Sequence, residues 1–163
     1  MVEHVLAEGD IAVATLRKPE AIADLAAKQP SNKLLVLKLD VAKPEQIKTA
    51  FAAALKQFGR IDVVFNNAAF GLLGEVESTP DDMARAMFDV NFFGAANVSK
   101  EAVRVFRDVN KPQGGKLLQV SSMVGYRPTP TLAYYAASKL GESYNATWLC
   151  VHRDSGIVQL WRE

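Results

Sequence analysis

The sequence predicts an α/β fold with a parallel sheet that is covered by helices on both faces. Short apolar runs alternate with longer segments whose apolar residues recur at helical spacing. The runs are continuously apolar, as in residues 34–39 (LLVLKL), which is typical of strands buried on both faces. At 163 residues the chain is long enough for one hydrophobic core, so we expect a single domain over residues 1–163.

The first part of the chain alternates regularly between helices and strands. Gly9 and Gly59 suit the residue after a helix end, whereas Pro19 and Pro44 suit the first turn of a helix. The patterns predict helices over residues 1–9, 19–28 and 44–58, and strands over residues 11–16, 34–39 and 61–65.

The second part of the chain continues this alternation with longer helices. Thr79 is the predicted N-cap of a long helix, with Pro80 at its first position and two acids near the positive end of the helix dipole. Glycines then turn the chain toward a further strand. The predicted elements are a helix over residues 81–109, a strand over 117–120, a helix over about 131–151 and a strand over 156–160.

The composition excludes several classes of protein. The formal net charge of +1 gives no electrostatic reason to expect a nucleic-acid partner. The single cysteine, Cys150, excludes an internal disulfide and has no metal-binding partner at a suitable spacing, so we expect no metal. No apolar run approaches the roughly 18 residues of a membrane span. The acidic start also lacks the features of a signal peptide, so we expect a cytoplasmic protein with no membrane segment.

Candidate chemistry lies between residues 116 and 140. Tyr135 and Lys139 are four residues apart, so their side chains share one face of a helix. A nearby ammonium lowers the pKa of a tyrosine from its usual value of about 10, which makes the phenol a usable general acid or base. Ser122 follows a predicted strand, at the end where parallel sheets bind ligands. Its hydroxyl could hold a carbonyl or alcohol oxygen.

Each of these motifs also has a plainer interpretation. A Tyr-x-x-x-Lys pair is common on solvated helix faces, and serines at strand ends form caps and turns. Tyr134 is not a candidate, because Ser138 stands where its lysine would be. The joint arrangement of the motifs is therefore more informative than any one of them.

Taken together, these motifs resemble the active-site segment of the short-chain dehydrogenase/reductase family. The segment combines Ser-Ser-x-x-Gly at 121–125, a spacing of 13 residues from Ser122 to Tyr135, and Tyr-Ala-Ala-Ser-Lys at 135–139. Residues 66–69 (NNAA) look like the family's Asn-Asn-Ala-Gly strand end, with Ala69 in place of the glycine. The resemblance covers about residues 1 to 140.

The resemblance implies a Rossmann-like doubly wound sheet and an oxidoreductase that interconverts a secondary alcohol and its ketone or aldehyde. Tyr135 would donate or accept the proton, and Ser122 would hold the substrate oxygen. Lys139 would lower the pKa of Tyr135 and bind the nicotinamide ribose, and Asn91 would support a water-linked proton relay. The partner implied is a small alcohol or carbonyl compound, and the family also makes a homo-oligomer plausible.

The resemblance further implies which residues bind the cofactor. Asp40 matches the family's aspartate that meets the adenine, with Val41 beside it, and Asn67 and Ala68 match the strand end at the cofactor. Tyr135 and Lys139 would contribute to the same site.

The residues after strand 11–16 predict which cofactor is used. A carboxylate there would accept a hydrogen bond from the ribose 2′-hydroxyl and repel a 2′-phosphate. This chain has Arg17 and Lys18 instead, and no acid before Glu20. A guanidinium binds phosphate through its planar fork, so we predict NADP(H) in preference to NAD(H). The plainer interpretation is that both cations solvate a strand end.

Two parts of the family pattern have no counterpart in these 163 residues. They are the first strand with its Gly-x-x-x-Gly-x-Gly turn, and the last strand with the loop that covers the substrate. The strand order 3-2-1-4-5-6 would place the missing first strand between strands 11–16 and 61–65. Either those two strands pair directly, or the sheet carries an unfilled slot.

These departures predict a chain that is truncated at both ends, whose activity is open. An alternative is a catalytically inactive fragment or partner subunit that lacks the turn for the pyrophosphate. A third interpretation is a related epimerase or dehydratase with a similar Tyr-Lys pair, although the short chain and Asn91 count against it.

Overall fold

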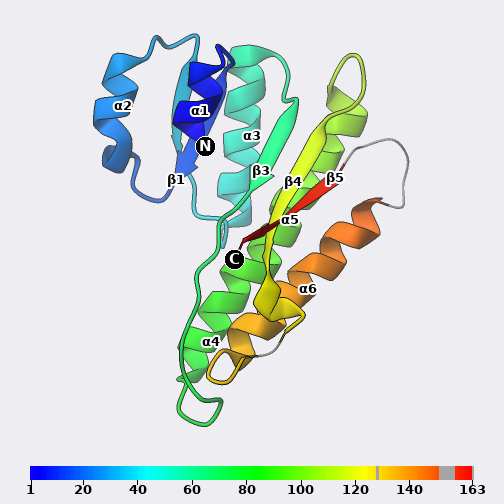
Figure 1. The fold of residues 1–163 in the computed structure, drawn as a ribbon. Helices are drawn as coiled ribbons and strands as arrows, with labels where there is room; N and C mark the ends of the chain where they lie inside the picture. Colours follow the sequence, from blue (N-terminus) through cyan, green and yellow to red (C-terminus); the bar gives the residue numbers. More distant parts are fainter. Residues whose placement is uncertain (128, 151–156, 163) are drawn as a thin grey trace. The chain divides into compact units, whose positions relative to one another are not determined.

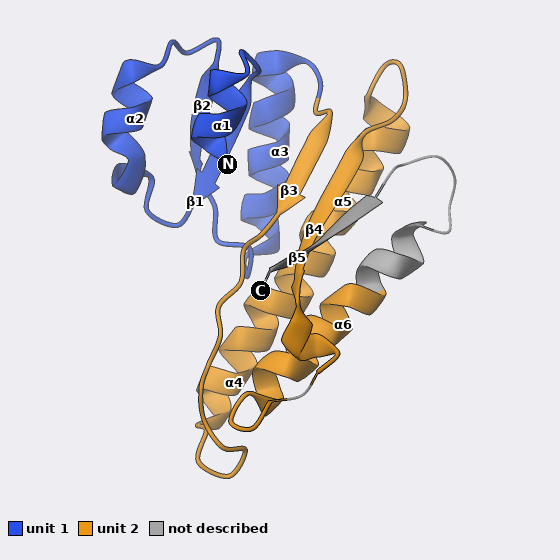
Figure 2. Ribbon diagram, viewed as in Figure 1, with its two compact units in different colours: residues 1–60 blue, residues 61–163 orange. Residues whose placement is uncertain are grey.

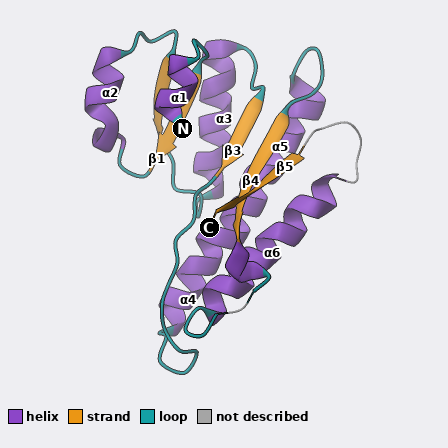
Figure 3. Ribbon diagram, viewed as in Figure 1, coloured by secondary structure: helices purple, strands orange, loops and turns teal. Residues whose placement is uncertain are grey.

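The protein folds into two compact units, residues 1–60 and residues 61–163 (Figure 2). The computed structural model describes residues 1–127, 129–150 and 157–162. Each unit contains its own parallel sheet and the helices that pack on it (Figures 1 and 3). The expectation of one domain over the whole chain stays a prediction.

Unit 1 is built on a sheet of two parallel strands. Its elements are α1 (Val2–Ala7), β1 (Ala12–Leu16), the 3-10 turn η1 (Pro19–Ile22), α2 (Ala23–Lys28), β2 (Leu34–Lys38) and α3 (Pro44–Phe58). The small side chains of Ala12 and Ala14 are buried in the core of this unit, together with Leu34. They leave room for apolar residues of α1 and α2, which pack on this cluster. The predicted helices and strands of this region are confirmed to within about two residues.

The ends of α3 follow the predicted signals. Pro44 lies in the first turn, where its missing N–H costs no helical hydrogen bond. Gly59 caps the carboxyl end with a φ of 77°, a left-handed conformation that suits a residue without Cβ. Its N–H donates to the carbonyl oxygen of Leu55 at 2.8 Å. Ile47 and Phe51, on the predicted apolar face, are buried.

Unit 2 is built on a sheet of three parallel strands, with β4 (Lys116–Ser122) between β3 (Val63–Asn66) and β5 (Ile157–Arg162). Val63 lies opposite Lys116, and Leu117 lies opposite Ile157. Its elements are β3 (Val63–Asn66), α4 (Asp81–Phe88), the π-helical turn η2 (Asp89–Gly94), α5 (Ala95–Arg104), a second π-helical turn η3 (Val105–Val109), β4 (Lys116–Ser122), the 3-10 turn η4 (Met123–Gly125), α6 (Ala133–Cys150) and β5 (Ile157–Arg162).

The long helix predicted over residues 81–109 is present, but it contains two π-helical turns, η2 and η3. The prediction of Thr79 as its N-cap is wrong, because the helix begins at Asp81 and Pro80 takes the N-cap position. The Thr79 hydroxyl instead donates to the carbonyl oxygen of Glu75 at 2.7 Å. The hydroxyl therefore bonds to the loop before the helix and does not cap the helix.

The described strands form two separate parallel sheets. β1 pairs with β2, and β3 pairs with β4. Within the described part of the chain, no ladder joins β1 to β3.

Helices α5 and α6 pack on the sheet of unit 2. Helix α5 packs against β3 and β4, and α6 packs against β4, β5 and α5. The buried apolar core of unit 2 includes residues of α4, α5, η3 and β4, namely Met87, Ala95, Val98, Ala102, Val105, Phe106 and Leu117. Among the described residues, none of the helices is both long and apolar enough to cross a membrane.

The close approach of η4 to α6 leads to a test of packing. A methyl group at Gly125 would lie 3.0 Å from the backbone nitrogen of Leu140 and 3.3 Å from the carbonyl carbon of Lys139. Because backbone cannot swing aside, we expect Gly125→Ala to lower the free energy of unfolding by about 1–3 kcal/mol. Urea denaturation followed by circular dichroism measures this change.

Gly71→Ala is the matched control for this substitution. Its methyl group would lie 3.6 Å from the ring of Tyr135, an ordinary contact. Its stability should stay within about 0.5 kcal/mol of the wild type. A Gly125→Ala protein that is equally stable would show that η4 and α6 separate easily.

Candidate active site

A small cavity opens at the carboxyl ends of β3 and β4, inside unit 2. Its volume is about 190 Å³. Three segments line it: the stretch after β3, the end of β4 and the first turns of α6. The lining residues are Asn67, Ala69, Phe70, Gly71, Val120, Ser121, Tyr135 and Lys139. The cavity therefore lies at the edge of a parallel sheet where ligands bind in such folds.

The cavity brings together some of the predicted site residues of unit 2. Asn67, Tyr135 and Lys139 line it. Ala68 and Ser122 belong to the segments that form it but are not among the lining residues, and Asn91 lies behind one of those segments.

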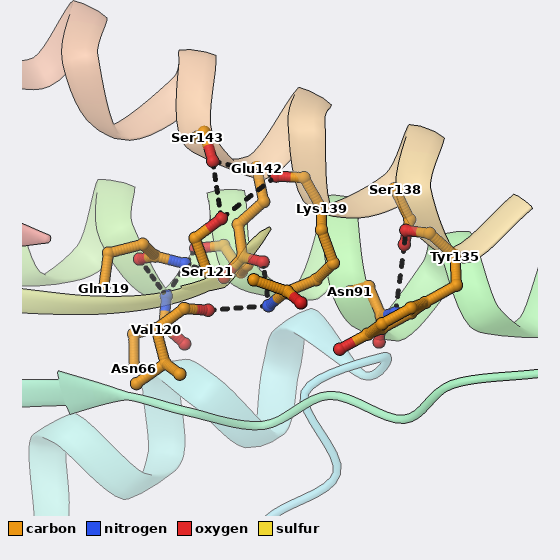
Figure 4. Close-up of polar contacts among 12 residues, drawn as sticks. Asn66, Asn91, Gln119, Val120, Ser121, Tyr135, Ser138, Lys139, Glu142 and Ser143 are labelled. Carbon is orange, nitrogen blue, oxygen red and sulfur yellow. Dashed lines mark hydrogen bonds and ion pairs between the residues drawn. The ribbon is translucent and has the colours of Figure 1, made fainter. Parts of the chain in front are cut away.

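Tyr135 and Lys139 reach the cavity from successive turns of α6. Their spacing places both side chains on one face of the helix. The Lys139 ammonium donates to the carbonyl oxygen of Val120 at 2.6 Å and pairs with the carboxylate of Glu142 (Figure 4). The predicted effect of Lys139 on the pKa of Tyr135 stays a prediction.

Glu142 is the central acceptor of a buried polar network. One carboxylate oxygen accepts from Lys139, and the other accepts from the side-chain amide of Gln119. The amide oxygen of Gln119 accepts in turn from Asn66 at 2.9 Å (Figure 4). It also accepts from the Ser99 hydroxyl at 3.3 Å. Burial raises the pKa of the Glu142 carboxyl, while the charge of Lys139 and the hydrogen bonds from Lys139 and Gln119 oppose this effect. The sequence analysis did not identify this network.

The two serines at the end of β4 have different environments. Ser122 is half-buried, and its hydroxyl oxygen accepts from the backbone N–H of Val124 at 3.4 Å, where it caps η4. The capping role considered for this serine is therefore present in the structure. Ser121 is buried, and its hydroxyl shares a hydrogen bond of 2.6 Å with the hydroxyl of Ser143. Ser121, rather than Ser122, contributes to the cavity lining.

Asn91 lies buried in the π-helical turn η2 and holds the segment after β3 in place. Its amide oxygen accepts from the N–H of Phe70 at 3.0 Å, and its amide nitrogen donates to the carbonyl oxygen of Phe70 at 2.8 Å. The same nitrogen lies 3.1 Å from the Ser138 hydroxyl of α6. Asn91 therefore acts on the cavity through Phe70, a lining residue. Its role in a proton relay stays a prediction.

The other predicted cofactor residues lie in unit 1. Arg17 and Lys18 are exposed and directly follow β1. Asp40 is half-buried after β2, where its carboxylate accepts from the backbone N–H of Ala42 at 3.0 Å, and Val41 is buried. Because β1 and β2 are parallel neighbours, these four residues lie at the same edge of their sheet.

Comparison with known proteins identifies the relatives of this chain. A family model described as short chain dehydrogenase matches residues 1–147. An uncharacterized oxidoreductase of Schizosaccharomyces pombe is 42% identical over 139 residues, which are 85% of this chain and 45% of that protein. A 3-ketodihydrosphingosine reductase of Bacteroides thetaiotaomicron is 30% identical over 139 residues, 85% of this chain and 48% of that protein. The chain thus spans about half the length of these curated relatives.

Solved structures show the same fold. A short-chain dehydrogenase from Streptomyces avermitilis superposes with a TM-score of 0.83 at 28% identity, over 98% of this chain and 58% of that one. An alcohol dehydrogenase from the archaeon Thermococcus sibiricus, complexed with 5-hydroxy-NADP, has a TM-score of 0.87 at 24% identity, over 98% of this chain and 68% of that one. The predicted Rossmann-like α/β fold is confirmed, and the chain belongs to the short-chain dehydrogenase/reductase family of oxidoreductases.

Proposed function

We propose that this chain carries the catalytic side chains of an NADP(H)-dependent oxidoreductase that interconverts a secondary alcohol and its ketone or aldehyde. The observation that carries the proposal is the shared cavity of Tyr135 and Lys139 at the carboxyl ends of β3 and β4. A phenol beside this cavity can give a proton to a substrate oxygen or take one from it, and the ammonium can stabilise the negative charge that results.

The side chains provide the proton transfer and the orientation that such a reaction needs. A nicotinamide bound at the cavity that Tyr135 and Lys139 line would supply the hydride chemistry at the carbonyl or alcohol carbon. Tyr135 gives its phenolic proton to the carbonyl oxygen during reduction and, as phenolate, takes the hydroxyl proton during oxidation. Ser122 accepts its hydrogen bond from Val124 through a lone pair, so its O–H still has the capacity to donate to the substrate oxygen.

The donors around the cavity fit the cofactor chemically. An ammonium has three N–H donors. Two of those of Lys139 meet Val120 and Glu142, so a third is available for a ribose hydroxyl at the cavity that Lys139 lines. Asn67 adds an exposed side-chain amide to the same lining. In unit 1, the exposed Arg17 and Lys18 support the binding of a 2′-phosphate.

The first test compares two neighbouring tyrosines. NADPH titrated into the purified chain, followed by nicotinamide fluorescence, should bind saturably with a micromolar Kd. With a panel of small ketones, Tyr135→Phe should lower turnover by about 10²–10⁴-fold, because the proton donor is lost. Tyr134→Phe removes the same hydroxyl from the adjacent position and should leave turnover unchanged.

Two outcomes would contradict the proposal. Equal turnover of Tyr135→Phe and the wild type would exclude Tyr135 as the general acid. A lack of saturable NADPH binding would favour the alternative of an inactive fragment or partner subunit.

The second test concerns the choice of cofactor. Arg17→Glu replaces the exposed guanidinium after β1 by a carboxylate, which would repel a 2′-phosphate and accept from a 2′-hydroxyl. We expect the affinity for NADPH to fall by about tenfold or more, since a charged hydrogen bond contributes about 1.5–3 kcal/mol. The affinity for NADH should be unchanged or higher.

Lys56→Glu is the control for charge alone. It makes the same change in charge in the last turn of α3 and should leave the ratio of the NADPH and NADH affinities unchanged. An equal loss of affinity for both cofactors in Arg17→Glu would show that Arg17 does not select for the phosphate.

A further inference from the structure

Lys139 and Glu142 form an ion pair in the interior of unit 2. Lys139 is 2% exposed and Glu142 is 3% exposed. Both residues lie on α6, three positions apart, and the pair packs against the end of β4 (Figure 4). A charge buried to this degree is expensive unless an opposite charge and hydrogen bonds compensate it.

The hydrogen-bond directions around Glu142 fit an ionised carboxylate. Both of its oxygens accept, one from Lys139 and one from Gln119. The orientation of the Gln119 amide is determined from its other end, where its oxygen accepts from Asn66 and Ser99. Its nitrogen must then face Glu142. If the carboxyl were protonated, its O–H would point at the N–H donor of Lys139 or Gln119 and would find no acceptor there.

The other polar groups of the network around the pair are neutral. Asn66 on β3, Gln119 and Ser121 on β4, Ser99 on α5 and Ser143 on α6 are amides or hydroxyls. Tyr135 is the titratable group that shares the cavity with Lys139. Among these described neighbours, Glu142 alone carries a charge opposite to that of Lys139.

We propose that Glu142 is a positioning residue that keeps Lys139 charged and holds its ammonium at the wall of the cavity. The catalytic meaning of this role rests on the proposed function, in which Lys139 acts on Tyr135 and on the cofactor ribose. Without Glu142, the buried ammonium would face only neutral dipoles. Desolvation would then favour the uncharged amine, which could support neither partner.

Unit 1 contains a matched pair for comparison. Lys48 and Glu45 on α3 are also three positions apart, with Nζ and Oε1 separated by 3.1 Å. Their side chains are 65% and 82% exposed, respectively. Water replaces the lost partner of an exposed pair, so removing Glu45 should have little effect on the charge of Lys48.

The test follows the two lysines directly by NMR. Protein labelled with ¹³C at the lysine ε-carbon is titrated with base as the wild type, Glu142→Gln and Glu45→Gln, and Lys139→Met and Lys48→Met assign the two signals. We expect the titration midpoint of Lys139 to fall by about one pH unit or more in Glu142→Gln. The midpoint of Lys48 should fall by no more than about 0.4 pH unit in Glu45→Gln. Equal midpoints of Lys139 in Glu142→Gln and the wild type would overturn the proposal.

The wild type keeps the proposal testable if Glu142→Gln does not fold. With glutamate labelled at the δ-carbon, Glu142 should titrate above the exposed glutamates, because burial raises its pKa. The Lys139 signal should shift together with it, and independent titration of the two groups would overturn the proposal.

Turnover provides the functional part of the test. In Glu142→Gln the activity should decline at a lower pH than in the wild type, as Lys139 loses its proton. An unchanged pH profile would exclude a positioning role in the reaction. If the wild type fails to bind NADPH, the proposed function fails, whereas the NMR titration still decides whether Glu142 keeps Lys139 charged.

Discussion

The interior charge of Lys139 is the constraint on which much of unit 2 depends. An ammonium that is 2% exposed needs acceptors, and it finds them in a backbone carbonyl of β4 and in the carboxylate of Glu142. Glu142 then needs a second donor, which Gln119 supplies from the centre of β4. Gln119 in turn orders Asn66 on β3, so one charge on α6 accounts for polar residues on two neighbouring strands.

The site also depends on close packing at the junction of β4 and η4. Ser122 ends the strand and caps this turn, and Gly125 lets α6 come close to it. The cavity forms where this junction meets the segment after β3, which Asn91 holds through both backbone groups of Phe70. Sites built on packed helices and strands are held more precisely than sites on loops. These contacts therefore fix the positions of Tyr135 and Lys139.

Much of the fold could be predicted from the sequence, for local reasons, and three of the predicted residues, Asn67, Tyr135 and Lys139, line one cavity. Periodic apolar residues, with Pro44 and Gly59 at the ends, locate α3 well because these signals act within one helix. Glu142 was missed because its spacing from Lys139 does not show that the pair is buried, which depends on packing against β4. A signal was available in Gln119, since an amide inside an apolar strand needs a buried partner. The cofactor preference assigned to Arg17 depends on a ligand, and no local pattern decides it.

The π-helical turn η2 has a consequence for how this chain tolerates changes in length. A π turn holds one residue more than an α-helical turn, so the faces before and after it are offset by about 100° relative to a continuous α-helix. Asn91 lies inside this offset, and Ser99, which contacts Gln119, lies after it. Deleting a single residue from η2 would restore regular winding and turn one of these two side chains away from its partners. Length in this turn is therefore under tighter constraint than amino-acid identity at its exposed positions such as Phe93.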